Sequence, residues 1–268
     1  MSEFELSIIF PAFIACLLVL STHVPLGMEV LRRGIIFIDL AIAQVAGLGV
    51  IAADTMGWEA RGWMVQFAAV SAALVAAGIL HWTDKRWPEI QEAIIGALFV
   101  LAATAGILIL AGNPHGGEHL KELLVGQVLW VNIHQLLPVA IISALVVAAW
   151  FWQREHLHGM GFYALFAFAV TASVQLVGIY LVFASLIIPA LATRHIEHRW
   201  LRVICGYGVG IVGCLAGLVL SVGADLPAGA IVVWSLAITA LIFAWLVWPI
   251  IRMRISNDSE RQQSEAGE

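Results

Sequence analysis

Long apolar stretches, separated by short polar loops, recur along the whole chain. A helix needs roughly 20 mostly apolar residues to cross a membrane. Stretches of about that length lie near 4–22, 35–53, 62–81, 93–112, 135–152, 162–180, 201–222 and 228–250. The pattern therefore predicts an all-α, polytopic membrane helical bundle with about eight spanning helices.

A further apolar piece, VFASLIIPAL at 182–191, directly follows the sixth stretch. The apolar segment 162–193 is too long for one straight crossing of roughly 30 Å. Pro189 also disturbs a regular helix, because proline has no backbone N–H. We therefore expect a break near Gly178 and a broken or re-entrant half-helix near 180–193.

Basic residues gather in alternate loops, and this sets the expected orientation. Loops rich in Lys and Arg stay on the cytoplasmic side of a membrane. Of the 13 Lys and Arg, all but Arg61 and Lys121 fall in such loops: Arg32, Arg33, Lys85, Arg86, Arg154, Arg194, Arg199, Arg202, Arg252, Arg254 and Arg261. The N-terminus is predicted outside and the C-terminus in the cytoplasm. The piece after Gly178 must then return to the cytoplasmic side before Arg194.

The composition excludes an ordinary soluble domain, because 62% of the 268 residues are hydrophobic, 12% are charged and the mean hydropathy is +0.96. The chain has no nucleotide-binding motif, and we expect no nucleic-acid partner. Its last residues, RMRISNDSERQQSEAGE, are polar. We therefore expect a transmembrane domain at 1–251 and a disordered cytoplasmic tail at 252–268.

Two polar residues, Asp39 and Gln44, interrupt the apolar run RRGIIFIDLAIAQVAGLG at 32–49. A buried carboxylate costs several kcal/mol unless it is paired or neutralised, and such residues in spanning helices usually face an ion or substrate pathway. An ion pair with Arg32 or Arg33 is the structural alternative for Asp39. Five residues turn a helix by about 500°, which leaves Asp39 and Gln44 roughly 140° apart. One ion cannot readily bind both side chains of a regular helix.

The histidines offer a second set of candidates. His115 and His119 in NPHGGEHLKE have i, i+4 spacing with Glu118 between them, on the predicted outer side. Short His-rich tracts can bind metal, so these three residues could meet an arriving cation; an ordinary polar loop is the alternative. Single histidines, His23 and His81 among them, lie near predicted helix ends, where we expect interfacial or capping roles.

Five segments, read in order, resemble the ABC-3 family of metal-uptake permeases. They cover most of the chain, from about 23 to 240. The segments are VPLGMEVLRRGIIFIDLAIAQVAGLGV, QEAIIGALFVLAATAGILIL, LLVGQVLWVNIHQL, LVGIYLVFASLIIPALATR and ADLPAGAIVV. The resemblance implies a permease subunit of a bacterial inner-membrane importer for divalent metal cations. Zinc is the first expectation, with manganese or iron as alternatives.

The resemblance also implies partners and site residues. The permease would pair with a second copy of itself, with cytoplasmic ABC ATPase subunits that use ATP, and with an extracytoplasmic metal-binding protein. It would hold no permanent cofactor, and the cation would move by alternating access at the homodimer interface. Asp39 would line the pathway and bind metal, whereas the family histidine four residues later is Ala43 here. Gln44 carries over only as a weak polar gate.

A short connector, QREHLHGMG at 153–161, matches the family's ATPase-coupling element. The resemblance assigns this coupling role to Glu155, His156, Leu157, His158 and Gly159, although a plain solvated loop would have the same composition.

Two other classes of protein stay open as alternatives. A membrane-embedded metalloenzyme would place carboxylates and histidines in helices, but the His-Glu-x-x-His and Gly-x-Ser-x-Gly patterns are absent. An ATP-independent secondary cation transporter would use broken helices and internal repeats, and the second half shows no convincing repeat of the first. We therefore expect a transport subunit and not an enzyme.

Overall fold

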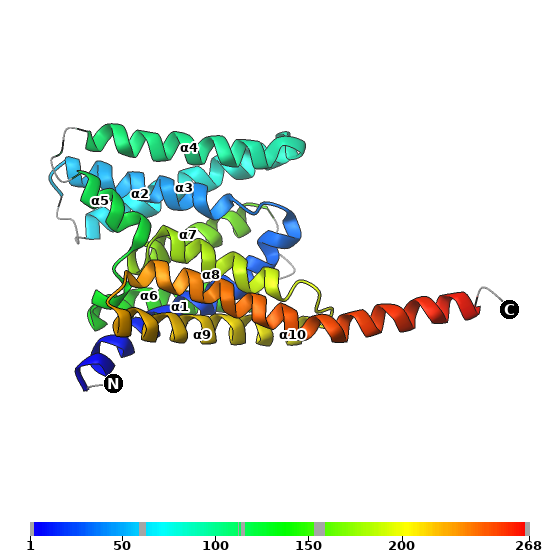
Figure 1. The fold of residues 1–268 in the computed structure, drawn as a ribbon. Helices are drawn as coiled ribbons and strands as arrows, with labels where there is room; N and C mark the ends of the chain where they lie inside the picture. The colour runs from blue at the N-terminus through cyan, green and yellow to red at the C-terminus, as the bar shows by residue number, and fades with distance from the viewer. Residues whose placement is uncertain (1–2, 59–62, 112, 114–115, 153–158, 266–268) are drawn as a thin grey trace.

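The computed structural model describes residues 3–58, 63–111, 113, 116–152 and 159–265, and all regular secondary structure in these ranges is helical (Figure 1). The elements are α1 (Glu3–Arg33), α2 (Ile38–Thr55), α3 (Trp63–Arg86), η1 (Pro88–Ile90), α4 (Gln91–Leu110), α5 (Gly116–Val125), η2 (Val128–Trp130), α6 (Ile133–Trp152), α7 (Met160–Val177), α8 (Ile179–Ala192), α9 (Arg199–Ala224) and α10 (Ala228–Glu265). Within the described ranges, eight helical segments are long and apolar enough to cross a membrane. This confirms the predicted all-α membrane bundle. Division of the chain at 251/252 and disorder of the tail stay predictions.

The first helix is longer than the sequence predicted, since α1 continues through Pro25 to Arg33. A proline leaves the carbonyl four residues earlier without its helical hydrogen bond, and that carbonyl belongs to Ser21. The hydroxyl of Tyr207 on α9 donates to the Ser21 carbonyl oxygen at 2.8 Å. The helix can therefore run on past Pro25. His23 consequently lies inside a helix and is fully buried, so its predicted place at a helix end is wrong.

The predicted break lies at Gly178, where α7 ends and α8 begins. Gly178 has φ +80° and ψ 164°, a conformation that residues with a Cβ rarely adopt. The loop after α5 touches this point: a Cβ on Gly126 would collide with the Val177 carbonyl. From the break, α8 runs back through the bundle and packs against α1 and α10. The 14-residue α8 is shorter than the spanning helices, as expected of a broken half-helix.

The bundle has two distinct ends (Figure 1). At one end, the loop between α1 and α2 meets the start of α4, because the Ile36 N–H donates to Glu92 Oε1 at 2.5 Å. The Arg33 guanidinium lies 4.0 Å above the Phe162 ring at the same end. The start of α4 also bonds to the end of α3, since Gln91 Oε1 accepts the Thr83 hydroxyl. Arg33 and Lys85 thus belong to one end, in agreement with the loop alternation from which orientation was predicted. At the other end, Gly126 lies against Gly178. Which end faces the cytoplasm stays a prediction.

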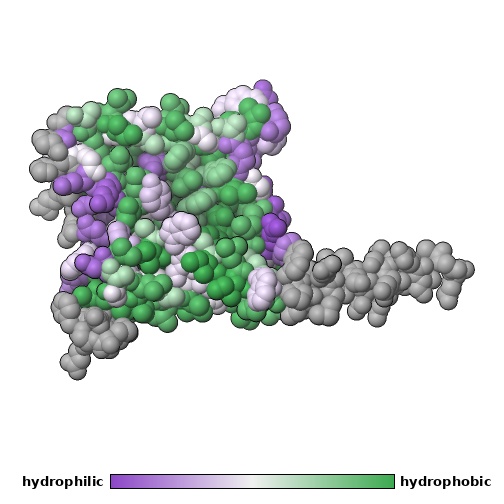
Figure 2. All heavy atoms as spheres, in the orientation of Figure 1, coloured by the Kyte–Doolittle hydropathy of each residue, from purple (hydrophilic) through white to green (hydrophobic). Residues whose placement is uncertain are grey.

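Helix α9 packs closely on both neighbours through small residues. A Cβ on Gly210 would meet Leu20 of α1 at 2.6 Å, and one on Gly217 would meet the Val232 Cα of α10 at 2.5 Å. Small residues permit this close approach in lipid, where the hydrophobic effect does not drive helices together. The middle of the face shown in Figure 2 is largely apolar. Large apolar side chains such as Phe67, Leu108 and Trp234 are more than two-thirds exposed. A lipid environment accounts for that surface.

Candidate functional site

Asp39 lies in the first turn of α2, directly after a sharp turn of the chain. Gly34 has φ +72°, which lets the chain reverse between α1 and α2. The Ile35 N–H donates to the Val30 carbonyl at 3.3 Å, and the Ile38 N–H donates to the Ile35 carbonyl at 3.2 Å. The residue before the helix is Phe37, which has no side-chain oxygen to cap the helix. The first turn of α2 therefore depends on groups outside its own sequence.

The Asp39 side chain is fully buried, and neither carboxylate oxygen has a hydrogen-bond partner among the described residues. The guanidinium groups of Arg32 and Arg33 bond instead to Glu29, with Arg32 Nε 2.9 Å from Oε2 and Arg33 Nε 2.7 Å from Oε1. The structural alternative, an ion pair of Asp39 with one of these arginines, is thus not present. The helix N-terminus favours a nearby carboxylate by about 0.3–1 kcal/mol, up to about 2. Burial of an unpaired charge costs more than that.

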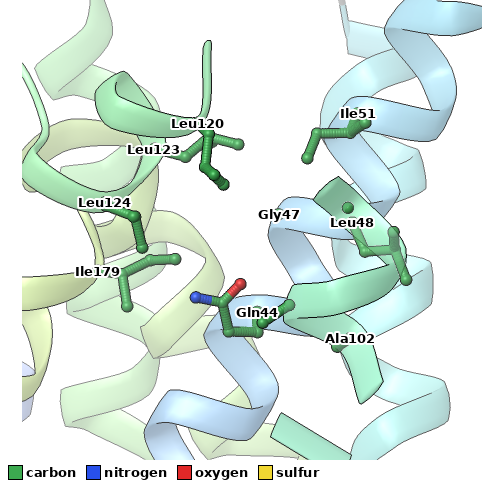
Figure 3. A pocket seen from close by; sticks show the side chains of 11 residues that line it. Gln44, Gly47, Leu48, Ile51, Ala102, Leu120, Leu123, Leu124 and Ile179 are labelled. Atoms are coloured by element: carbon green, nitrogen blue, oxygen red, sulfur yellow. The ribbon is translucent and has the colours of Figure 1, made fainter. Parts of the chain in front are cut away.

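Gln44 lies on a different side of α2 and lines a small hollow (Figure 3). Helices α2 and α4 form one wall, and α5 with the start of α8 forms the other. The Gln44 amide points across the hollow toward Leu124 and Ile179. It is the one polar side chain among the lining residues, which are Gln44, Gly47, Leu48, Ile51, Ala102, Ala103, Gly106, Leu120, Leu123, Leu124 and Ile179.

Asp39 is not among the residues that line this hollow. The helical geometry explains why, since positions 39 and 44 face directions roughly 140° apart. Within the described ranges, no group of three or more His, Cys, Asp or Glu side chains is placed to hold a metal ion. A cation that passed along α2 would therefore meet the Gln44 amide and the Asp39 carboxylate separately.

The second set of predicted site residues lies around α5. Glu118 is exposed in the first turn of that helix. The backbone of His119 follows it in α5, and His115 lies outside the described residues. A metal site formed by these three residues stays a prediction.

The predicted coupling connector is described only at its end. Glu155, His156, Leu157 and His158 lie outside the described residues, whereas Gly159 is described and starts α7 with φ +68°. A Cβ there would meet Cε1 of His81 on α3 at 2.9 Å, so the connector ends against α3. The coupling role of all five residues stays a prediction.

Sequence reasoning did not single out Glu92 or Gln91 at the start of α4. Glu92 accepts the backbone N–H of Ile36, at the turn before α2. Gln91 is buried; its Nε2 donates to the Leu80 carbonyl at 2.9 Å, and its Oε1 accepts the Thr83 hydroxyl at 2.9 Å. One signal could have found Glu92. Phe37 cannot cap a helix with its side chain, so the turn before α2 is a place where a side chain from another segment can bond to the backbone.

Comparison with known proteins places the chain among membrane transport proteins. A profile of the ABC 3 transport family matches residues 5–164 and 156–247. The chain is 24% identical to the manganese transport system membrane protein MntC of Halalkalibacterium halodurans, over 78% of this chain and 76% of that protein. It is 25% identical to the chelated iron transport system membrane protein YfeC of Yersinia pestis, over 62% of each chain.

A solved structure has the same fold. PsaBC from Streptococcus pneumoniae, in complex with a Fab, superposes with a TM-score of 0.69 at 20% identity, covering 87% of this chain and 89% of that one. The similarity extends over nearly the whole bundle.

Proposed function

Because the chain belongs to the ABC 3 transport family, we propose that it is the membrane permease subunit of an ABC importer for a divalent metal cation. It is a polytopic membrane transport component. Zinc, manganese and ferrous iron are the candidate cargoes. The relatives named for manganese and chelated iron support this choice. The oxygen donors of Asp39 and Gln44 suit the harder cations, whereas zinc prefers imidazole or thiolate ligands.

One observation carries the proposal: Asp39 is a fully buried carboxylate without a hydrogen-bond partner among the described residues. In a dry environment its charge attracts a cation far more strongly than it would in water. No side chain among the described residues has to leave the Asp39 carboxylate before the cation arrives. A single carboxylate holds a metal ion less firmly than a closed site of several ligands, and weak binding lets the ion leave again.

The rest of the assembly follows from the family. We propose that two copies form the translocation path, that cytoplasmic ATPase subunits drive alternating access at their interface, and that an extracytoplasmic binding protein delivers the cation. The connector that ends at Gly159 would transmit motion from the ATPase. The proposed location is the bacterial inner membrane, with the C-terminus in the cytoplasm.

Uptake of radioactive zinc, manganese and ferrous iron, measured in cells with and without this chain, tests the function. We expect one of these cations to accumulate only when the chain is present. Uptake should stop when ATP is depleted and persist when a protonophore collapses the ion gradients. Loss of uptake with the protonophore at constant ATP would instead indicate a secondary transporter.

The Asp39→Asn variant tests the pathway. Two unit charges roughly 4 Å apart attract by about 4 kcal/mol at an effective dielectric constant of about 20, so removal of the carboxylate charge should lower uptake at least about 100-fold. Asp225→Asn is the matched control, because Asp225 is exposed at the end of α9 and its φ of +51° suits asparagine. Both variants should reach the membrane in normal amounts. Normal uptake by Asp39→Asn would remove Asp39 from the pathway.

A further inference from the structure

The helix that carries Asp39 begins without a cap of its own. Phe37 precedes α2 and provides no side-chain acceptor for the first N–H groups. A capping side chain contributes about 0.5–2 kcal/mol to a helix start. This start lies within one turn of Asp39, so the place of the Asp39 carboxylate depends on what holds the turn before the helix.

Glu92 of α4 bonds to the turn that leads into α2. Its Oε1 accepts the Ile36 N–H, and the two heavy atoms lie 2.5 Å apart. A carboxylate at this point bonds to the backbone and also interacts favourably with the positive end of the α2 dipole. Glu92, 56 residues further along the chain, therefore caps the turn that precedes α2, and we call this bond the cap.

The neighbouring residue fixes the position of Glu92. Gln91 ties the start of α4 to the end of α3, through hydrogen bonds at 2.9 Å to the Leu80 carbonyl and to the Thr83 hydroxyl. Consecutive residues of α4 thus bind the turn before α2 and the end of α3. The start of α2 is held against a part of the bundle that is itself anchored.

The Glu92 carboxylate also lowers the stability of the protein through its second oxygen. The second oxygen of Glu92, Oε2, is buried and has no hydrogen-bond partner among the described residues. A buried acceptor without a partner destabilises a protein by about 1–3 kcal/mol. That cost would be avoided by an apolar residue at position 92, at the expense of the bond to Ile36.

We propose that Glu92 is a positioning residue for transport: it caps the turn before α2 from α4 and thereby keeps the Asp39 carboxylate buried in its place. This inference rests on the proposed function of Asp39. The cap itself, however, can be tested without any transport measurement.

Thiol labelling of a cysteine introduced at position 39 tests the cap directly. The parent protein for this test carries Asp39→Cys with Cys16, Cys205 and Cys214 replaced by serine or alanine. Into it we introduce Glu92→Ala, Glu92→Gln or the control Glu89→Ala; Glu89 is an exposed carboxylate in η1 at the same end of the bundle. The probe is a membrane-impermeant maleimide, added to inside-out membrane vesicles.

Glu92→Ala should raise the labelling rate between about 2- and 30-fold, the range that corresponds to loss of an ordinary cap. Glu92→Gln keeps an oxygen that can accept the Ile36 N–H, so its rate should stay near that of the parent. Glu89→Ala should also match the parent. If Glu92→Ala labels no faster than Glu89→Ala, Glu92 does not hold α2 and the proposal is overturned.

Transport in the background with Asp39 intact supplies the second readout. Uptake should fall in Glu92→Ala and recover in Glu92→Gln, with equal amounts of protein in the membrane. An equal loss in both variants would show that charge and not the hydrogen bond matters, which would overturn the capping role. If Glu92→Ala does not reach the membrane, Glu92→Asp replaces it in both assays, because its carboxylate is one methylene too short to reach Ile36.

The two readouts separate this inference from the proposed function. Faster labelling at position 39 in the Glu92→Ala protein, together with normal uptake in Asp39→Asn, would support the cap and refute the pathway. Unchanged labelling together with lost uptake in Asp39→Asn would do the reverse.

Discussion

The contact between Gly126 and the Gly178 break allows a sharp test of the fold. Gly126 has φ +72°, and a Cβ there would collide with the Val177 carbonyl and lie 2.6 Å from the Gly178 nitrogen. Both obstacles are backbone atoms, so no change of side-chain rotamer can relieve the overlap. Gly126→Ala must therefore move either the loop after α5 or the break between α7 and α8.

The expected loss of stability in Gly126→Ala has two contributions. A left-handed conformation costs a residue with a Cβ about 1–2 kcal/mol, and forced overpacking costs about 1–3 kcal/mol. Together they predict a loss of about 2–5 kcal/mol in the free energy of unfolding. Gly208→Ala is the matched control, because Gly208 lies exposed within α9 and a Cβ there would meet nothing within 4 Å. Alanine in place of a helical glycine should stabilise the protein by about 0.5–1 kcal/mol.

Unfolding in mixed detergent micelles, titrated with SDS, measures both variants on the same scale. The two alanine substitutions should differ in sign and by at least about 2.5 kcal/mol. Metal uptake should fall as well in Gly126→Ala, because Ile179, next to the break, lines the same hollow as Gln44. A Gly126→Ala protein as stable as the parent would refute the close contact and with it the arrangement of α8.

Two other substitutions test the hydrogen-bonding groups of α1 and α2. Gln44→Ala should lower uptake less than about tenfold, since an uncharged amide in an otherwise apolar hollow contributes under about 1.4 kcal/mol to holding a cation; a loss as large as that of Asp39→Asn would contradict this. Tyr207→Phe should destabilise the protein by roughly 0.6 kcal/mol and at most about 1.7, the range for side-chain hydrogen bonds between membrane helices. In a Pro25→Ala background the same substitution should cost less, because residue 25 then has an N–H for the Ser21 carbonyl. An undiminished cost in the double variant, measured by SDS titration, would mean that the tyrosine acts through packing.

The membrane helices could be predicted because each must itself contain enough apolar residues to cross the membrane. The end of α1 could not, since Pro25 is a sound local signal for the end of a helix. What carries the helix past it is the Tyr207 hydroxyl, 186 residues away in sequence. The break at Gly178 was predictable from length and from Pro189, whereas its contact with Gly126 was not, because nothing in either segment specifies the other.

The residues of the candidate site also differ in whether the sequence could predict them. Asp39 stands out because a carboxylate in an apolar run is costly wherever it lies. Glu92 lies in a first helical turn at a predicted membrane boundary, where a carboxylate is ordinary. Its contact with Ile36 depends on how α2 and α4 pack. The missing cap after Phe37 is a local signal that a partner exists, but it does not say which residue that is.

The two polar residues of α2 lie in different environments, and the comparison between them distinguishes a pathway from packing. Gln44 has an amide beside a small hollow, whereas the Asp39 carboxylate is fully buried and without a hydrogen-bond partner among the described residues. If both residues served only to pack α2, replacing Asp39 by its neutral isostere would remove an uncompensated charge and leave uptake intact or improved. If a cation passes Asp39, the same substitution removes the charge that attracts it, and uptake falls while the protein becomes no less stable. We therefore expect Asp39→Asn to lose uptake without losing stability, and Gln44→Ala to lose little uptake, only if the cation passes Asp39.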